Sequence, residues 1–404
     1  MHCPYTRFPL QRKFHCIFLC LLLLLIITNG CARLIKPPGP ALKELSGRDL
    51  HIRQWIDDMN FQDLEKAIDN SLTYFARLPD TVRFQYGELS YSPEEMSASM
   101  KLFISVLNEY RGEVLAREIK EKFLFFESMN SDRESFFTGY YEPVIKGSLV
   151  PTDEYPEPLY ETPDDLIEVD LSMFSGKWQH EKIVGRLSGN RLMPYDSRDE
   201  IVYLKSLEDR AMPIAYASEI ELFFLQIQGS GMIRLRDGSI KRVNYAQKNG
   251  HPYNAVGRVL SDRIPPHEMS LQAIKDYLYA HPDEVRDILS YNQSYTFFRE
   301  IDEGPLGDIE VALTPGRSIA MDRRTIPRGG LVFIETEIPL FDQGKISDWI
   351  PVRRFALVQD TGGAIQGHGR VDMFFGHGED AEMVAGHLKR SGRCFLIVAR
   401  KEFL

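Results

Sequence analysis

From Phe136 onward, the chain consists of short apolar runs broken by glycine and proline, a texture that strongly limits the folds available to it. The runs lie at residues 223–228, 233–235, 240–245, 331–338, 355–358, 371–375 and 394–399. Short apolar segments bounded by turn-forming residues are typical of strands. We therefore expect a β-rich region in which Arg236-Asp237-Gly238 forms a hairpin turn.

The preceding region, from about residue 50 to 130, has helical periodicity instead. Ser92-Pro93-Glu94-Glu95 is typical of a helix start, with serine as the cap and proline at the first helical position. Apolar residues then recur at helical spacing, at Met96, Met100, Phe103, Leu107 and Tyr110. Further helices are expected at 270–292, capped by Ser270, and at 380–389. The predicted class is mainly β with a helical amino-terminal part (α+β).

The first thirty residues have the pattern of a secretory signal peptide. Arg7, Arg12 and Lys13 precede an apolar run from Phe14 to Thr28. A membrane span needs roughly 20 apolar residues, and this run is shorter. Residues 1–30 are therefore predicted to be a signal peptide, and a single-span anchor is the alternative.

The end of this segment, Thr28-Asn29-Gly30-Cys31-Ala32, resembles the lipobox of bacterial lipoproteins. Thr28 departs from the usual aliphatic residue, and an ordinary cleavage site with an incidental cysteine is the alternative. The resemblance implies lipidation of Cys31, a tether over residues 31–48, and sorting to the outer membrane, facing the periplasm. Removal of the leader and lipidation of Cys31 would leave Cys394 alone, which excludes an intrachain disulfide.

Charge and motif content exclude several classes of partner and cofactor. The formal net charge is −10 and becomes more negative once the basic leader is removed. A nucleic-acid partner is therefore not expected, because a phosphate backbone requires a basic surface. His368, His377 and His387 lack the compact spacing of metal ligands. We expect no metal and no other cofactor, since no nucleotide-binding glycine pattern occurs either.

Three aspartates in the β-rich tail are candidates for chemistry: Asp322, Asp360 and Asp372. Asp372 lies within an apolar strand, where alternation places it on the same face as Phe374 and opposite Val371. A carboxylate in such surroundings has a raised pKa and can hold a proton for donation. The alternative is that these aspartates cap turns beside the neighbouring glycines.

Four motifs, in this order, resemble the membrane-bound lytic murein transglycosylase A (MltA) family. They are Phe137-Thr-Gly-Tyr-Tyr-Glu-Pro143, Gln226-Ile-Gln-Gly-Ser-Gly231, Asn249-Gly-His-Pro-Tyr253 and the segment from Asp360 to Gly376. The three aspartates and their glycines match the family's carboxy-terminal 3D domain. The resemblance runs from about Phe136 to the end, and more weakly into the helical region.

The resemblance implies a double-psi β-barrel with a second β-domain inserted into it and a groove between the two. The helical part and barrel would comprise residues 49–142 and 302–404, and the insert residues 143–301. It also implies that Asp372 is the catalytic acid, with Asp360 beside it in support. Thr138 and Tyr140 match groove residues, and Asp322 matches the motif. Gln228 and Ser230 are candidate sugar contacts, or alternatively parts of a tight turn.

The function implied is that of a peptidoglycan lytic exotransglycosylase. Such an enzyme cleaves the β-1,4 bond between N-acetylmuramic acid and N-acetylglucosamine and forms a 1,6-anhydro-muramoyl end. Its partners would be peptidoglycan glycan strands, the membrane that holds its lipid anchor, and cell-wall synthesis or hydrolysis complexes. Three alternatives are a non-catalytic peptidoglycan-binding lipoprotein, a two-carboxylate hydrolase using Asp360 and Asp372, and an aspartic-protease-like homodimer built on Asp360-Thr-Gly.

Overall fold

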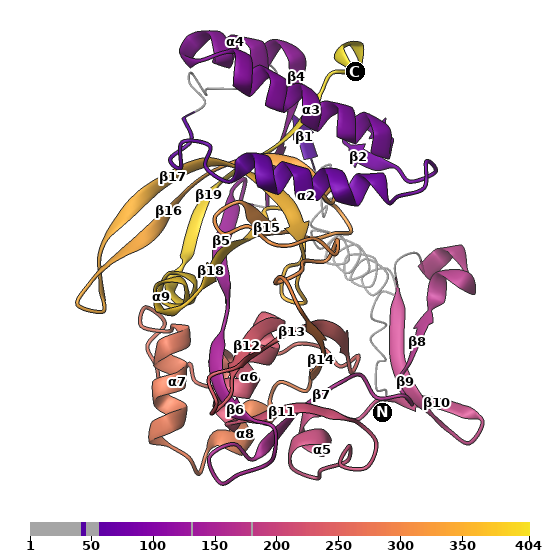
Figure 1. The fold of residues 1–404 in the computed structure, drawn as a ribbon, viewed down its shortest axis with the longest axis vertical. Coiled ribbons are helices and arrows are strands. Elements are labelled where there is room, and N and C mark those ends of the chain that lie inside the picture. Colours follow the sequence, from indigo (N-terminus) through magenta and orange to yellow (C-terminus); the bar gives the residue numbers. More distant parts are fainter. Residues whose placement is uncertain (1–41, 46–55, 131, 179–180) are drawn as a thin grey trace, which may run out of the picture. The chain divides into compact units, whose positions relative to one another are not determined.

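The computed structural model describes residues 42–45, 56–130, 132–178 and 181–404 (Figure 1). The expected signal peptide and Cys31 lie outside the described residues. In the described ranges, no helix has both the length and the apolar character needed to cross a membrane. Leu42–Glu44, expected within the tether, forms strand β1, in which Leu42 is buried.

The larger sheet has eight strands in the order β1-β4-β19-β16-β17-β15-β18-β5. Their bounds are β1 Leu42–Glu44, β4 Phe123–Ser128, β5 Ser135–Glu142, β15 Ser318–Ala320, β16 Leu331–Asp342, β17 Lys345–Asp360, β18 Arg370–His377 and β19 Lys389–Ala399. Strand β5 pairs in parallel with β18 and also antiparallel with β19. This second pairing closes six of the strands into a barrel, which confirms the predicted barrel architecture.

The helical amino-terminal part covers this sheet with three helices (Figure 1). They are α2 Leu64–Ala76, α3 Pro93–Glu109 and α4 Gly112–Lys122, accompanied by the hairpin of β2 Phe84–Tyr86 and β3 Leu89–Tyr91. Helix α3 begins as predicted, with a capping box in which Ser92 and Glu95 bond each other's backbone. Its buried stripe of Met96, Met100 and Phe103 joins the core of the eight-stranded sheet.

A second sheet of six strands lies between Val144 and Ile301 in the sequence, in the order β14-β13-β12-β6-β11-β7. Its strands are β6 Val144–Ser148, β7 Glu157–Tyr160, β11 Pro213–Ala217, β12 Ser230–Arg234, β13 Ile240–Lys248 and β14 Thr296–Ile301. The chain passes from β5 of the first sheet into β6 of the second across Pro143 alone. The domain limits at residues 143 and 301 remain a prediction.

Smaller elements complete the region between these strands. A three-stranded sheet contains β8 Ile167–Asp170, β9 Lys182–Ser188 and β10 Arg191–Pro194, and short 3-10 helices lie at Leu171–Met173, Gly176–Trp178, Val256–Arg258 and Lys401–Phe403. The α-helices are α5 Arg198–Val202, α6 Glu219–Gln228, α7 Leu271–Ala280, α8 Val285–Ser290 and, after β18, α9 Glu379–His387. Ser270 caps α7 as predicted, by accepting the Ala273 N–H.

The strand predicted at Phe223–Gln228 is wrong, because this segment is the second half of helix α6. The helix buries Leu225 in the core of the six-stranded sheet and Phe224 in a separate cluster with α7 and α8. A helix packed on two sides is apolar almost all round, so its sequence loses the helical period that would distinguish it from a buried strand. Gly229, at a φ of 81°, ends the helix in the left-handed region.

Candidate active site

Asp372 lies in the middle of β18, between β15 and β5. Its register partners are Ala320 on β15 and Thr138 on β5. The Thr138 hydroxyl donates a hydrogen bond to the Asp372 carboxylate. The predicted alternation is confirmed, because Val371 packs in the main core while Phe374 packs on Tyr140 with ring centroids 5.2 Å apart. The strand therefore holds Asp372 on the face that carries two aromatic rings.

The environment of Asp372 favours its protonated form. Burial raises the pKa of this carboxyl above its ordinary value of 3.8, against the opposing effects of Arg370 and the Thr138 hydroxyl. The same burial lowers the pKa of Arg370. An apolar site that penalises the charged carboxylate makes Asp372 better able to hold a proton for transfer than an exposed aspartate.

Asp360 lies at the carboxyl end of β17. Its Oδ1 atom accepts the backbone N–H groups of Asp308, at 3.0 Å, and Thr361, at 2.8 Å. Burial nevertheless raises the pKa of Asp360 to about 7, against the opposing effect of those N–H groups and of Tyr140. The pKa of Tyr140 is itself raised, first by burial and then by Asp360 and Asp372. Tyr140 therefore lies close enough to both carboxyl groups to be affected by their charges.

Asp322 lies in the turn after β15 and is ionised at neutral pH. Its carboxylate accepts bonds from Arg324, at 2.9 Å from Nε and 2.6 Å from Nη2, and from the Gly367 N–H, at 2.7 Å. Burial alone raises the pKa of Asp322, but these donors outweigh it and lower the pKa to about 2. Asp322 therefore braces the loop before β18 and is a poor proton donor.

Two depressions adjoin these acids. One, of about 600 Å³, is lined by Tyr140, Gln228, Ser230, Asp322 and Asp360. The other, of about 570 Å³, is lined by Thr138, Gln228 and Tyr253 among others. Ile227 and Gln228 line both, so the end of α6 is their common wall. The structure thus gathers the predicted residues around two adjoining depressions, with Asp372 bonded to the Thr138 side chain in the wall of one.

Gln228 and Ser230 fit both of the interpretations offered for them. Gly229 makes a tight turn between α6 and β12, as the turn interpretation requires. Both side chains also line the 600 Å³ depression. The Gln228 Oε1 atom accepts the Tyr141 N–H at 3.2 Å, which leaves its amide donors for another partner.

Tyr253 is a site residue that the sequence analysis did not assign. Its pKa is raised by burial and then by the charge of Asp372. In the same motif, Asn249 donates to Asp196 and Gln293 carbonyls at 3.0 and 2.9 Å, and so anchors the loop that carries Tyr253. The signal was present, because Tyr253 ends one of the four motifs.

Gly139 in the first motif allows α9 to approach β5. A Cβ atom at this position would lie 2.8 Å from the Ala385 Cα atom and 2.6 Å from the Phe375 ring. These distances are shorter than any ordinary carbon contact. Gly139 therefore sets the spacing between the strand that carries Thr138 and Tyr140 and the helix that backs it.

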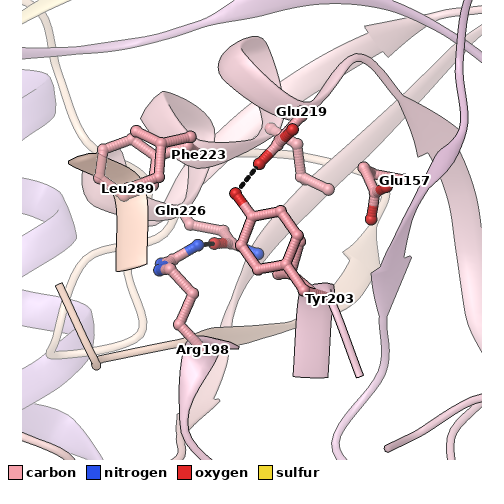
Figure 2. A pocket seen from close by; sticks show the side chains of 9 residues that line it. Glu157, Arg198, Tyr203, Glu219, Phe223, Gln226 and Leu289 are labelled. Carbon is pink, nitrogen blue, oxygen red and sulfur yellow. Dashed lines mark hydrogen bonds between the residues drawn. The ribbon is translucent and has the colours of Figure 1, made fainter. Parts of the chain in front are cut away.

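Beside α6 lies a small pocket of about 10 Å³, shown in Figure 2. Arg198, 3% exposed, donates to Gln226 Oε1 at 2.6 Å and to the Asn292 and Ser294 carbonyls. All three acceptors are neutral, and burial lowers the pKa of Arg198 to about 10. The pocket has room for about one water molecule. The Arg198 hydrogen bonds join Gln226 of α6 to the 292–294 segment, which indicates a structural role.

The three histidines noted in the sequence lie on separate elements. His368 is half-buried before β18, His377 is exposed at the end of β18, and His387 ends α9 with Nδ1 2.9 Å from the Met383 carbonyl oxygen. Cys394 is buried in β19. Within the described residues, no cluster of three or more histidine, cysteine or carboxylate side chains has a geometry suited to a metal ion.

Two family models match this chain, namely the MltA specific insert domain over residues 136–299 and the 3D domain over residues 317–398. The membrane-bound lytic murein transglycosylase A of Escherichia coli is 34% identical over 268 residues, and that of Vibrio cholerae is 31% identical over 263. These alignments cover 65% and 64% of this chain, and 65% and 63% of the relatives, so the matched region spans just under two thirds of their length.

Solved structures of related proteins share the fold. A membrane-bound lytic murein transglycosylase from Agrobacterium tumefaciens superimposes with a TM-score of 0.71 at 29% identity, covering 90% of this chain and 100% of that one. Escherichia coli MltA with bound chitohexaose gives a TM-score of 0.67 at 26% identity, covering 89% of this chain and 95% of that one. These similarities bear out the double-psi β-barrel with its inserted domain.

Proposed function

Because this chain belongs to the membrane-bound lytic murein transglycosylase A family, we propose that it cleaves peptidoglycan glycan strands without water. The bond broken is the β-1,4 link from N-acetylmuramic acid to N-acetylglucosamine, and the product is a 1,6-anhydro-muramoyl end. The observation that carries the proposal is Asp372, a carboxyl with a raised pKa, bonded to Thr138 in the wall of a 570 Å³ depression.

The chemistry needs one carboxyl that gives up a proton and takes one back. Protonated Asp372 donates to the glycosidic oxygen, which favours departure of the N-acetylglucosamine end and an oxocarbenium-like state at the muramoyl ring. The Asp372 carboxylate then accepts the proton of the muramoyl 6-hydroxyl as that oxygen closes on the anomeric carbon. Ordinary glycosidases use two carboxyl groups, since one must activate water or form a covalent bond; here the substrate supplies the nucleophile.

Neighbouring residues have supporting roles in this proposal. Thr138 orients the Asp372 carboxyl through its hydroxyl. Asp360 holds the backbone at Asp308 and Thr361 and lies beside Tyr140. Gln228 and Ser230 provide amide and hydroxyl groups suited to sugar hydroxyls. Asp322 fixes the loop before β18 by its bond to Gly367.

The cellular setting is part of the same proposal. We assign residues 1–30 to a signal peptide, Cys31 to lipidation and residues 31–48 to the tether, with an outer-membrane location facing the periplasm. Both curated relatives are named as membrane-bound, which supports a place in the cell envelope. Cleavage from strand ends, and association with other wall enzymes, are the finer expectations for this chain.

The decisive experiment digests purified sacculi in water enriched in oxygen-18 and analyses the products by mass spectrometry. The proposal predicts muramoyl ends lighter by one water than reducing ends, with no oxygen-18 incorporated. A hydrolase using Asp360 and Asp372 would instead give reducing ends that carry the heavy isotope. A non-catalytic binding lipoprotein would bind sacculi and release neither product. An aspartic-protease-like homodimer would also leave the glycan bonds intact, and a pepstatin-type inhibitor distinguishes it from the binding protein.

A further inference from the structure

The 600 Å³ depression is lined by four cationic side chains, and three of them are neutralised by carboxylates in its wall. The pairs are Arg299 with Glu310, Arg323 with Asp308 at 2.8 Å, and Arg324 with Asp322 at 2.6 Å. Lys248 is the fourth cation. Among the described residues, no carboxylate oxygen lies within 4.0 Å of its ammonium group. Among the described residues that line the depression, Lys248 is therefore the one cation without an ion-pair partner.

The surroundings of Lys248 also disfavour its positively charged form. It is half-buried at the end of β13, and its Nζ atom lies against the loop after Asp360, since a Cβ atom on Gly363 would be 2.8 Å from it. Burial lowers the pKa of Lys248, and the nearby Arg323 lowers it further. A lysine on an open surface extends its ammonium into water. The Lys248 ammonium instead lies in the 600 Å³ depression, close enough to Arg323 for that charge to affect it.

An unpaired ammonium in a binding depression is suited to a ligand anion. In the proposed substrate, the sugar rings themselves are neutral, and negative charge enters through the 3-lactyl substituent of muramic acid. That substituent ends in a carboxylate when the strand is bare of peptide, and carries peptide carboxylates when the stem is attached. The chemistry shared by both forms is a carboxylate carried by the lactyl arm, either the arm's own or one belonging to the attached peptide.

We propose that Lys248 binds a carboxylate on the lactyl arm of muramic acid, and so makes the enzyme prefer muramoyl glycan over neutral glycan. This inference rests on the proposed function, because it concerns the same substrate and the 600 Å³ depression, which shares Gln228 with the depression beside Thr138. Four acids line the wall and would repel a polyanion such as a polyphosphate. They are Asp308, Glu310, Asp322 and Asp360. They leave room for one carboxylate beside one unpaired lysine.

The test compares the affinities of three oligosaccharides of equal length by calorimetry, in an Asp372→Asn background that prevents turnover. The ligands are chitohexaose, which has no lactyl arm, a peptide-free muramoyl oligosaccharide, and a peptide-bearing one. Lys248→Met should reduce the ratio of muramoyl to chitohexaose affinity by about tenfold or more, as expected for loss of a charged hydrogen bond. Lys248→Arg, which retains the positive charge, should restore part of the ratio.

Lys241→Met is the matched control, since Lys241 lies on the same strand but pairs with Glu300 at 2.6 Å and does not line the depression. It should leave the ratio unchanged. A loss confined to the peptide-free ligand assigns the contact to the lactyl carboxylate, and a loss confined to the peptide-bearing ligand assigns it to the stem. Equal losses for chitohexaose and both muramoyl ligands, or no loss at all, overturn the inference. The proposed function is tested separately by the sacculus digest, and it fails if the wild-type enzyme releases no anhydro-muramoyl ends.

Discussion

Asp322, in the turn after β15, and Asp372, in β18, belong to the same three-aspartate pattern, yet their surroundings shift their pKa values in opposite directions. Asp322 is met by Arg324 and by the Gly367 N–H, and its pKa falls to about 2. In the part of the chain that the structure describes, the Asp372 carboxylate accepts a hydrogen bond from the Thr138 hydroxyl but none from a guanidinium or a backbone N–H, and burial raises its pKa. The difference lies in the donors that each strand or turn brings to the carboxylate.

Asp360 is intermediate between the two. Two backbone N–H groups donate to the Asp360 carboxylate, as at Asp322, but within the described residues no guanidinium does. The effect of burial exceeds that of these donors, and the pKa of Asp360 is about 7. Backbone donors alone therefore do not offset burial here, while a bidentate arginine does. This contrast separates a residue that braces the fold from residues that can hold a proton.

The largest effect is expected on removing the proton at Asp372. Asp372→Asn keeps the shape and still accepts the Thr138 hydroxyl, but it has no acidic proton to donate. Activity on sacculi should fall by about 10²- to 10⁴-fold, measured as the rate of release of anhydro-muramoyl products. A comparable loss in Asp322→Asn, at a pH where that variant is fully folded, would erase the distinction between the two aspartates.

Asp360→Asn is expected to stabilise the protein at alkaline pH while it weakens activity. The folded pKa of Asp360 is raised from 3.8 to about 7, so its contribution to stability is full below about pH 4 and is lost as pH rises through 7. Above pH 7 the variant should unfold with a free energy about 1–3 kcal/mol larger than that of the wild type. Urea denaturation at pH 4 and pH 8 measures this, and a constant difference between the two would contradict it.

Asp322→Asn should have the opposite effect and lower the stability of the protein. Its folded pKa is lowered to about 2, so its contribution is present above pH 4 and is lost as pH falls toward 2. The variant should be less stable than the wild type by about 1–2 kcal/mol at pH 7, since Arg324 is half exposed and partly screened. The same denaturation series tests it, and stabilisation at pH 7 would refute the bracing role.

The smallest effect is expected at Tyr140. Its hydroxyl favours the charged form of Asp360, so Tyr140→Phe should raise the pKa of Asp360 further. The alkaline loss of stability attributed to Asp360 should then move to higher pH, by a fraction of a unit to about one unit. An unchanged pH profile in the denaturation series would show that Tyr140 acts on Asp360 only through packing.

Much of this arrangement was accessible from the sequence, because strand alternation and helix capping are local. The face carrying Asp372 and the start of α3 at Ser92 followed from such patterns. Helix α6 was missed, since it packs on two sides and its apolar run has no period. The opposite behaviour of Asp322 and Asp372 was also inaccessible, as it depends on which donors the fold brings to each carboxylate.

Lys248 and Tyr253 illustrate a further limit. Both lie in or beside a recognised motif, but their importance comes from residues far along the chain. The Lys248 ammonium lies against Gly363, and the charge of Asp372 raises the pKa of Tyr253. A lysine near a turn is ordinarily solvated, so only the tertiary structure distinguishes this one. Sequence patterns identified the motif, and packing determined which of its members face the depression.

The central claim is that Asp372 holds its proton in the folded protein at a pH where Asp322 does not. It is tested most directly by titrating the aspartate carboxyl carbons of the intact protein by NMR, with Asp372→Asn and Asp322→Asn used for assignment. The account predicts that the Asp372 signal titrates above 3.8 and the Asp322 signal near 2. An Asp372 carboxyl that titrates at or below 3.8 would contradict it.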